Sequence, residues 1–522
     1  MTTESTAPDP AVKARARKKR LVVNRPVDRP GQFLKLRGLL DQPVLWQHAS
    51  LIPPQVAEGA PRKLPEVLYL AMPSFAAIWG SFSKAETALR EIDVWAIVCE
   101  TLREMQEHYR PQDEPFDLDR LLASSSLTAQ NFYDARRSWL APHLDSFETT
   151  FAELAAKAAL EVGYADPNGP GSCNNLTRTR TLAGDGKVTR EPGSRYAALA
   201  KDEENLTSKI TSKTHVVDKT TGEIVSALDM EGAAHLYNTG SGPVVGFKTV
   251  RLSLRNDETN STIIVAVKRP ATADEAACAV DAILETKKRL PGVLAVTYDA
   301  ALRGTHIRQL AREGGLVTVA PVAAKTAAHG KQPRVEKAGQ VAFVSHLRAG
   351  GVLCEHEFHH HGGQLAEIQL DSRGKKSLVP CPDPYVRIRP NKDSYRMYLE
   401  WEVRCAAGLP PGSAPALFDK LTWTITDERS DFNVAENLRA VPPGSERYSQ
   451  AKGWRQTIEN DNHQSDAAKA LRRGRSSRPD WNHVNEIGWS IVQNGVALQR
   501  DRRRRAHHHH TAPDAAEIGL AA

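Results

Sequence analysis

The chain has few cysteines, six in 522 residues, and aromatic residues make up only 6% of it. Scattered cysteines do not form the dense framework of a small disulfide-bonded secreted protein, so we expect a reducing compartment. No run of about 18 apolar residues occurs, and the N-terminal region is polar and basic. We therefore expect neither a membrane-spanning helix nor a secretory signal. There is also no repeat with a period of about 20 to 50 residues, which excludes a solenoid.

The remaining composition is that of a folded protein. Apolar residues make up 40% and charged residues 25% of the chain, which is ordinary for globular domains. A chain of 522 residues exceeds what one hydrophobic core usually serves, so two or three domains are expected.

Positive charge gathers in two segments. Residues 11–30 carry eight Lys/Arg against one acid, and residues 471–505 carry nine Arg against three acids. Because the formal charge of the whole chain is +7, the body between these arms is mildly acidic. This distribution suits a polyanion that is bound at basic arms around a carboxylate site, and the alternative is two solvated tails.

The apolar pattern changes along the chain. Helical spacings dominate from about residue 34 to 160. After a Pro- and Gly-rich break at 163–171, short β-branched runs give the order strand, strand, helix, strand, helix, strand. This order predicts an α/β fold, a mixed sheet with helices on its faces. Gly, Pro and His clusters interrupt residues 325–440, which we interpret as a mainly β insertion before a helix at about 446–471.

Three acidic residues are the candidates for catalysis. Asp299 directly follows an apolar run, so it would emerge at the carboxyl end of a buried strand, where α/β sheets place chemistry. Its structural alternative is a helix N-cap. Asp185 lies between Gly184 and Gly186, which would let a metal or phosphate approach the backbone. The alternative for Asp185 is a hairpin turn, because Asp-Gly is a strong turn signal.

Glu459 lies on the expected C-terminal helix. Arg455 is four residues earlier and therefore on the same helical face, where such pairs are often surface ion pairs. Singly, each of the three acids has such a structural explanation. Their order along the chain and the elements around them favour a shared function.

The order of these residues resembles the ribonuclease H-like catalytic domain of insertion-sequence DDE transposases. Asp185-Gly186 matches the D-G-T motif, and TYDAALRG around Asp299 matches the second-Asp motif, D-R-x-Y. Tyr448, Arg455 and Glu459 match the Y-R-E-K signature. GFKTVRLSLR also looks like the second strand of that domain, and the resemblance covers roughly residues 160 to 500.

The sequence departs from these motifs at four places. Lys187 replaces the usual Thr, Ala300 follows the second Asp, and six residues separate Tyr448 from Arg455. Asp466 stands where the signature has Lys, and Lys469 is the nearest substitute. Asp166, Asp218 and Asp229 are the rival candidates for the first acid.

The resemblance implies metal-dependent DNA strand cleavage and strand transfer at the ends of a mobile element. Asp185, Asp299 and Glu459 would bind two Mg²⁺ or Mn²⁺ ions, because hard carboxylate oxygens suit these cations. Asp185 would bridge both ions, and Arg455 and Tyr448 would contact phosphate. The alternatives are a catalytically decayed transposase that only binds DNA, and a stand-alone nuclease.

Further DNA contacts are expected from Lys187, Lys248 and Trp454, although tryptophans more often pack in a core. The partners would be the terminal inverted repeats of the element and the target DNA. A homodimer assembled on DNA in the cytoplasm, associated with the nucleoid, is also implied. The expected domains are a basic flexible arm at 1–30, a helical DNA-binding domain at 31–162, a ribonuclease H-like catalytic domain at 163–324 and 441–500, the mainly β insertion at 325–440, and a basic, disordered tail at 501–522.

Cysteine and histidine are concentrated in the expected insertion. Structural zinc is bound by four such side chains, and the candidates are Cys354, His356, Cys381 and Cys405. Their spacing departs from common zinc motifs, so loose surface histidines are the alternative.

Overall fold

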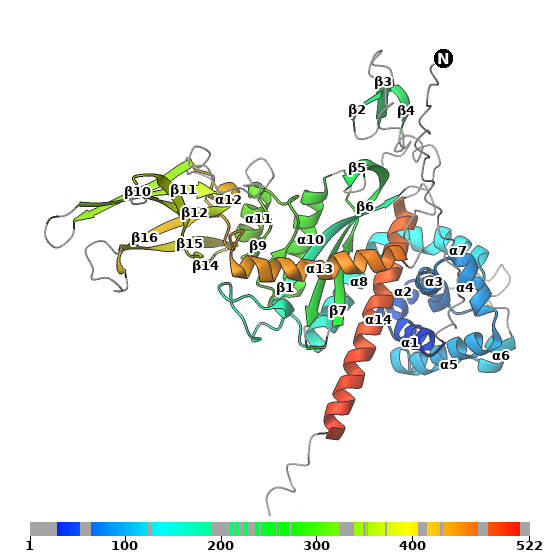
Figure 1. Cartoon of the computed structure of the whole chain (residues 1–522). Coiled ribbons are helices and arrows are strands. Elements are labelled where there is room, and N and C mark those ends of the chain that lie inside the picture. The colour runs from blue at the N-terminus through cyan, green and yellow to red at the C-terminus, as the bar shows by residue number, and fades with distance from the viewer. Residues whose placement is uncertain are drawn as a thin grey trace, which may run out of the picture.

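A computed structural model gives the architecture of the chain (Figure 1). Residues 1–28 of the expected basic arm, Asp229 and Lys469 lie outside the residues that it describes. The described residues are 29–52, 64–123, 127–190, 208–212, 215–218, 224–227, 235–239, 242–256, 258–259, 261–270, 274–322, 339–347, 351, 353–370, 373–405, 415–427, 432–467 and 479–511.

The N-terminal part is a group of helices packed on one apolar core. The helical pattern over 83–108 is two helices in the structure. The first begins after its N-cap Ser81 and ends before Arg90, and the second begins at Ile92. Gly80 ends the preceding helix with φ 86°, a left-handed conformation that favours glycine. The helices are α1 (Arg29–Leu40), α2 (Pro43–Ala49), α3 (Glu66–Trp79), α4 (Phe82–Leu89), α5 (Ile92–Tyr109), α6 (Leu118–Ala123), α7 (Ala129–Ala135), η1 (Arg136–Leu140), η2 (Ala141–His143) and α8 (Leu144–Glu161).

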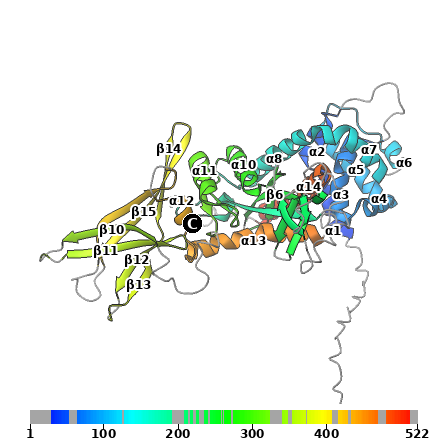
Figure 2. The ribbon, with the colours of Figure 1, turned by 90° about the horizontal axis from the view of Figure 1, so that it is seen from above.

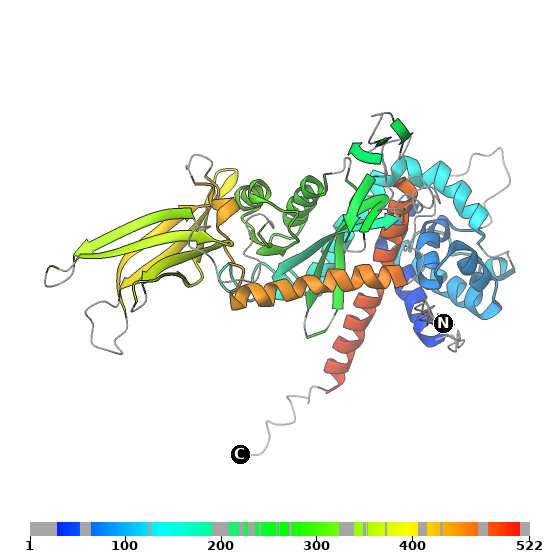
Figure 3. The ribbon, with the colours of Figure 1, turned by 45° about the horizontal axis from the view of Figure 1, so that its top comes forward.

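The last helix, α14 (Pro479–Thr511), completes this helical domain from the other end of the chain. It packs against α1 and α3, where a Cβ at Gly488 would lie 2.7 Å from the Cβ of Pro73. The helix also continues past residue 500, where we expected a disordered tail, and Figure 3 shows it crossing the molecule. Among the described residues, no helix combines the length and apolar character needed to cross a bilayer.

The centre of the molecule is a mixed sheet with flanking helices. β1 is antiparallel to β6 and parallel to β8, and β8 is parallel to β9. Val250–Ser253 of β6 pair with both β1 and β7, so these two strands lie on opposite sides of β6. The order strand, strand, helix, strand, helix, strand is confirmed. The elements are η3 (Arg178–Arg180), β1 (Thr181–Arg190), β5 (His235–Thr239), β6 (Gly242–Asn256), β7 (Ser261–Lys268), α10 (Glu275–Arg289), β8 (Ala295–Thr297), α11 (Gly304–Gly314) and β9 (Val317–Val319).

Helices cover both faces of this sheet, as Figure 2 shows. Neighbouring residues of a strand point to opposite faces. Gly186 of β1 faces Glu275 of α10, whereas Asp185 contacts the long helix α13 (Glu446–Ala467). α10 therefore lies on one face and α13 on the other.

The region 325–440 contains two antiparallel sheets that extend away from the central sheet (Figures 1 and 2). Trp401 and Val403 of one sheet and Phe358 and Leu365 of the other share an apolar core with Ala311 of α11. A separate small sheet precedes β5. The insertion elements are β10 (Gly339–Leu347), β11 (Leu353–His361), β12 (Gln364–Leu370), β13 (Lys376–Pro380), β14 (Tyr385–Asn391), β15 (Ser394–Cys405), β16 (Ala416–Thr424) and α12 (Val434–Asn437), and the small sheet is β2 (Ser208–Ser212), β3 (His215–Asp218) and β4 (Ile224–Ala227).

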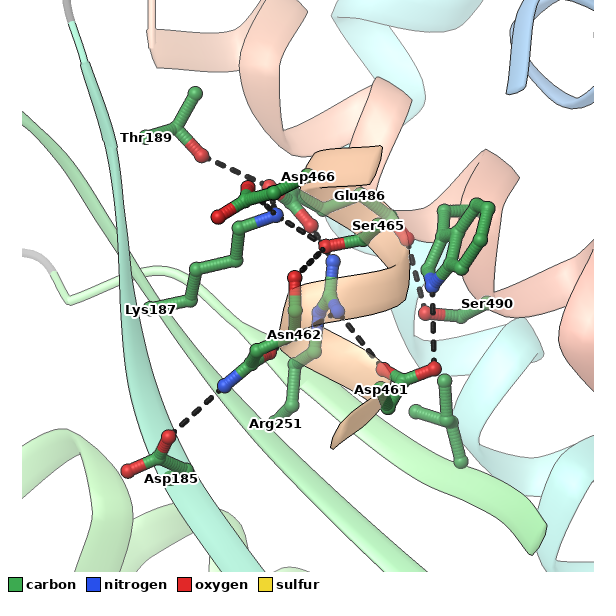
Figure 4. A network of polar contacts seen from close by, with 12 residues as sticks. Asp185, Lys187, Thr189, Arg251, Asp461, Asn462, Ser465, Asp466, Glu486 and Ser490 are labelled. Carbon is green, nitrogen blue, oxygen red and sulfur yellow. Dashed lines mark hydrogen bonds and ion pairs between the residues drawn. The ribbon is translucent and has the colours of Figure 1, made fainter. Parts of the chain in front are cut away.

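A buried ion network fastens α13 and α14 to the central sheet (Figure 4). Arg251 of β6 is fully buried; it donates to Asp461 of α13 at 2.9 Å and forms an ion pair with Glu486 of α14. Lys187 of β1 lies 3.7 Å from the same Glu486 and 3.1 Å from Asp466. Two cations thus neutralise acids from two helices, which fixes the position of α13 along the sheet.

Substitution of Glu486 by Gln should destabilise the protein strongly. The change keeps the shape of the side chain but leaves Arg251 and Lys187 with one fewer buried carboxylate, and loss of one partner of a buried pair costs about 3 kcal/mol or more. Urea unfolding followed by circular dichroism would measure this loss. Glu104→Gln, which removes an exposed ion pair with Arg37, is the control and should change stability little. A Glu486→Gln protein as stable as the control would contradict the role of the network.

Candidate active site

Two of the three predicted acids lie near each other at the carboxyl end of β8. The parallel pairing of β1 with β8 ends at Ala183 and Thr297, and Asp185 and Asp299 each follow two residues later. The charge of Asp299 raises the pKa of Asp185. Asp185 lies within β1 and its Cα is opposite Arg251 of β6, so it is not in a hairpin turn. Asp299 does not cap α11, whose N-cap is Arg303. Its Oδ1 instead accepts a hydrogen bond from the Ala301 N–H at 2.8 Å.

The third acid reaches this place through an arginine of α13. Arg455 donates from Nη1 to Asp185 Oδ1 at 3.1 Å and forms an ion pair with Glu459 one turn along the helix. The Asn462 amide donates to Asp185 Oδ2 at 2.9 Å. Arg455, Glu459 and Asn462 are spaced by four and three residues, so one face of α13 carries all three. The Arg455–Glu459 pair is therefore not an isolated surface contact, because Arg455 also binds Asp185 of the sheet.

The electrostatics of Asp185 are those of a crowded, buried carboxyl. Its pKa is raised from 3.8 to about 6, first because burial disfavours the carboxylate, and also because Asp299 and Glu275 are negative neighbours. The Arg455 guanidinium opposes this rise. The ionised form of Asp185 is thus energetically unfavourable in the folded protein, and a bound cation would stabilise it.

The glycines around Asp185 serve packing on the opposite face. A Cβ at Gly184 would lie 2.6 Å from the Tyr298 ring, and a Cβ at Gly186 would lie 2.1 Å from Glu275 Oε1. The sequence suggested that these glycines admit a metal or phosphate. The structure shows instead that they admit Tyr298 and Glu275, whose side chains are hydrogen-bonded at 3.0 Å.

A cavity of about 190 Å³ opens beside Asp299. Tyr448, Lys452 and Arg455 line it from α13, Thr297 lines it from β8, and Tyr298 lines it just after that strand. Tyr448 is mostly buried, which raises the pKa of its phenol, although Arg439 and Arg455 act against that rise. Two cationic side chains and a phenol thus border the acids, a surrounding that suits an anionic substrate.

The other residues predicted to contact DNA have different surroundings. Lys187 is buried in the ion network, so its ammonium is not presented to a ligand at the surface. Lys248 forms an ion pair with Glu275. Trp454 is 9% exposed and belongs to an apolar core. The partners of both lysines lie far away in the sequence, which is why local pattern did not reveal them.

The alternatives for the first acid are partly placed. Asp166 is exposed in a turn, where its Oδ1 accepts a hydrogen bond from Asn168 N–H at 2.9 Å. Asp218 ends β3 of the small sheet. Two residues of the site were missed, Asn462 and Lys452. Both lie at helical spacing from Arg455, a signal that the sequence did contain.

The predicted zinc ligands are only partly brought together. Cys354 and Cys405 lie close to each other and to His346, which was not predicted, and the ligand atoms of the three residues are all within 4.8 Å of one another. His356 is next to His346, with ring centroids 5.7 Å apart. Cys381 is not part of the group, because it follows β13 and bonds through its backbone to Leu365.

The raised pKa of Asp185 predicts a stability that depends on pH. The folded state binds this proton more tightly than the unfolded state, so the free energy of unfolding falls as pH rises from 3.8 to about 6. Asp185→Asn should remove this loss. We expect the variant to be more stable than the parent at pH near 7.5, by about 1 to 3 kcal/mol, and to show no such gain at pH near 4.

Urea unfolding at both pH values would measure the difference. Asp393→Asn, at an exposed position of the β14–β15 turn, is the matched control for the loss of a surface carboxylate. Equal pH dependence in the parent and Asp185→Asn would contradict the assignment of the shifted pKa.

The chemistry of this site has to be argued from its own geometry, because no protein-family model and no curated protein sequence matches the chain. In that geometry one arginine joins an acid of β1 to an acid of α13, and Asp299, after β8, acts on the acid of β1 through its charge. Carboxylates from separate elements beside cationic side chains suit a bound divalent cation and a phosphate ester.

Proposed function

We propose that this protein is a DDE-type DNA transposase, with Asp185, Asp299 and Glu459 as its catalytic acids. The observation that carries the proposal is the double ion pair of Arg455, which joins Glu459 of α13 to Asp185 of β1 beside Asp299. Arg455 and Asp185 are 270 positions apart in the sequence, so their meeting is not a consequence of local pattern.

The arrangement of the central sheet supports a ribonuclease H-like assignment. β7, β6 and β1 are antiparallel neighbours, and β8 and β9 are parallel to β1. Along the chain, an acid on β1 is followed by a hairpin, helix α10, an acid after β8, the β insertion and an acid on α13. This is the order of elements and acids on which the resemblance to DDE transposases depends.

The donor set fits Mg²⁺ or Mn²⁺. Asp185, Asp299 and Glu459 offer hard carboxylate oxygens, and the pKa of Asp185 is raised partly by the charge of Asp299, which a cation would counter. Two bound ions would supply an activated water or 3′-hydroxyl and stabilise the leaving oxygen. Arg455 and Tyr448 would orient the scissile phosphate, Arg455 through its planar fork of donors.

Two departures from the family motifs compensate each other. Lys187 stands where the first motif has Thr, and Asp466 stands where the signature has Lys. In the structure the two side chains form an ion pair of 3.1 Å between β1 and α13. The charges at the two departing positions thus neutralise each other, which supports an active site over a decayed one.

DNA would be bound by the basic surfaces beyond the site, with phosphate contacts supplying much of the affinity. The side chains of Arg502 to Arg505 are exposed in the C-terminal part of α14. Arg502 and Arg505 also form ion pairs with Asp41 and Asp501. The substrates in this proposal are the terminal repeats of the element and target DNA, cut by a homodimer that holds both ends.

The first test is cleavage of DNA that carries the sequences flanking the gene, with Mg²⁺ or Mn²⁺. The parent should cut and join strands, and Asp299→Asn should reduce the rate by at least about a thousandfold, because a carboxamide binds these cations poorly. Asp166→Asn, which changes a rival acid in an exposed turn, is the control and should cut like the parent.

The outcomes separate the alternatives. Tight binding of the ends without cutting by the parent would favour a DNA-binding protein that has lost catalysis. Cutting without strand transfer would favour a nuclease. Loss of cutting in Asp229→Asn but not in Asp185→Asn would move the first catalytic acid to Asp229.

Mn²⁺ should raise the melting temperature of the parent, since the cation binds the folded state and relieves the carboxylates. The rise should shrink below pH about 6, where Asp185 becomes protonated. Differential scanning fluorimetry with and without Mn²⁺ would measure this. The same rise in Asp185→Asn and in the parent would contradict a metal site at these acids.

A further inference from the structure

Three zinc-type ligands meet in the insertion, far from the acids. His346 of β10 and Cys354 of β11 are opposite each other in the strand register, and Cys405 is the last residue of β15. All their ligand atoms lie within 4.8 Å of one another. Two sulfurs and one imidazole at such separations match the softness and size that tetrahedral Zn²⁺ requires.

A second imidazole, the candidate fourth ligand, lies beside them. His356 lies two residues after Cys354 and therefore on the same face of β11. Its Nδ1 is 2.5 Å from Glu367 Oε1, so Glu367 can orient the ring through Nδ1 while Nε2 is the nitrogen that faces a metal. This Nε2 is buried and makes no hydrogen bond within the described part of the chain.

An aromatic ring packs against both imidazoles. The Phe418 ring of β16 stacks on His346 at 3.7 Å between centroids and lies 5.1 Å from His356. His346 and His356 are themselves stacked, with 17° between their planes. The two imidazoles therefore share one packed face of the β10–β11 pair.

The cluster joins the two sheets of the insertion. His346, Cys354 and His356 belong to the β10–β13 sheet, and Cys405 belongs to the β14–β16 sheet. Near the start of β15, Tyr395 contacts Gly315 at the end of α11, so the base of this sheet is held by the central domain. Cys405 is at the other end of this strand, and Figure 1 shows the two sheets extending away from that domain.

We propose that His346, Cys354, His356 and Cys405 form a structural zinc site that clamps the outer ends of the two insertion sheets. His356 lies outside the group of ligand atoms within 4.8 Å, so in this proposal its ring turns toward the other three ligands, with Glu367 as the partner of its Nδ1. Two thiolates and two neutral imidazoles balance the charge of Zn²⁺, so the complex is neutral. The proposal is independent of DNA cleavage, because none of these residues contacts the catalytic acids.

Cobalt substitution tests the site in the full-length protein. Apoprotein prepared with a chelator and a thiol reductant is titrated with Co²⁺, and the thiolate-to-cobalt charge-transfer absorption is recorded together with the visible bands of tetrahedral cobalt. One equivalent should produce both signals, and Zn²⁺ should displace them. The absorption reports thiolate ligands alone, so neither His507–His510 nor the carboxylate site contributes to it.

Variants identify the ligands. Cys405→Ser should reduce the charge-transfer absorption and weaken binding by more than about a hundredfold, and Glu367→Gln should weaken it by about tenfold to a hundredfold as an outer partner. Cys381→Ser is the matched control and should titrate like the parent. His356→Gln should weaken binding and change the visible bands, and an unchanged spectrum would overturn its assignment as the fourth ligand.

Two results would overturn the zinc site as a whole. The first is a parent protein without thiolate-to-cobalt absorption. The second is a Cys354–Cys405 disulfide, detected as two thiols that become titratable only after reduction of the denatured parent. Metal analysis of the parent purified under reducing conditions should instead give a zinc content that Cys405→Ser lowers by one equivalent and Cys381→Ser does not.

Discussion

The burial of Arg251 constrains much of the remaining structure. A fully buried guanidinium on a central strand has to be neutralised by acids that come from elsewhere, and here they come from α13 and α14. Because Asp461 occupies one face of α13, the adjacent face of that helix is directed toward β1. Arg455 and Asn462 lie on this second face and therefore reach Asp185, and Arg455 also pairs with Glu459 of the same face. The ion network thus sets the helix rotation on which the candidate site depends.

The same strand carries two charges whose environments oppose their ionised forms. Asp185 and Lys187 point to the same face of β1, and burial raises the pKa of Asp185 to about 6 and lowers that of Lys187 to about 7. Lys187 stays close to acids of both helices, whereas Asp185 shares Arg455 with Glu459. The electrostatic cost that remains at Asp185 is consistent with a site organised to receive a cation, since structures often lose stability where they bind ligands.

The parts of the site that could be predicted from the sequence are those set by local pattern. Asp299 was placed at a strand end by the apolar run before it, and Arg455 and Glu459 were placed on one helical face by their spacing. The burial of Lys187 could not be predicted, because its partner Glu486 is about three hundred residues away and long-range pairing leaves no local signal. The Cys and His residues show the same limit, since His346 meets Cys354 through strand pairing that their spacing does not reveal.

Helix α14 links the helical domain to the candidate site. It packs against α1 and α3 of that domain, contacts β7 of the central sheet, and contributes Glu486 to the network beneath α13. A hinge between the two domains would have to separate Glu486 from Arg251, which would leave buried charges without partners at a cost of several kcal/mol. The helical domain and the three acids should therefore move as one body. Under the proposed function, DNA bound to the helical domain would then reach the acids at a fixed distance and orientation, as accurate positioning of a scissile phosphate requires.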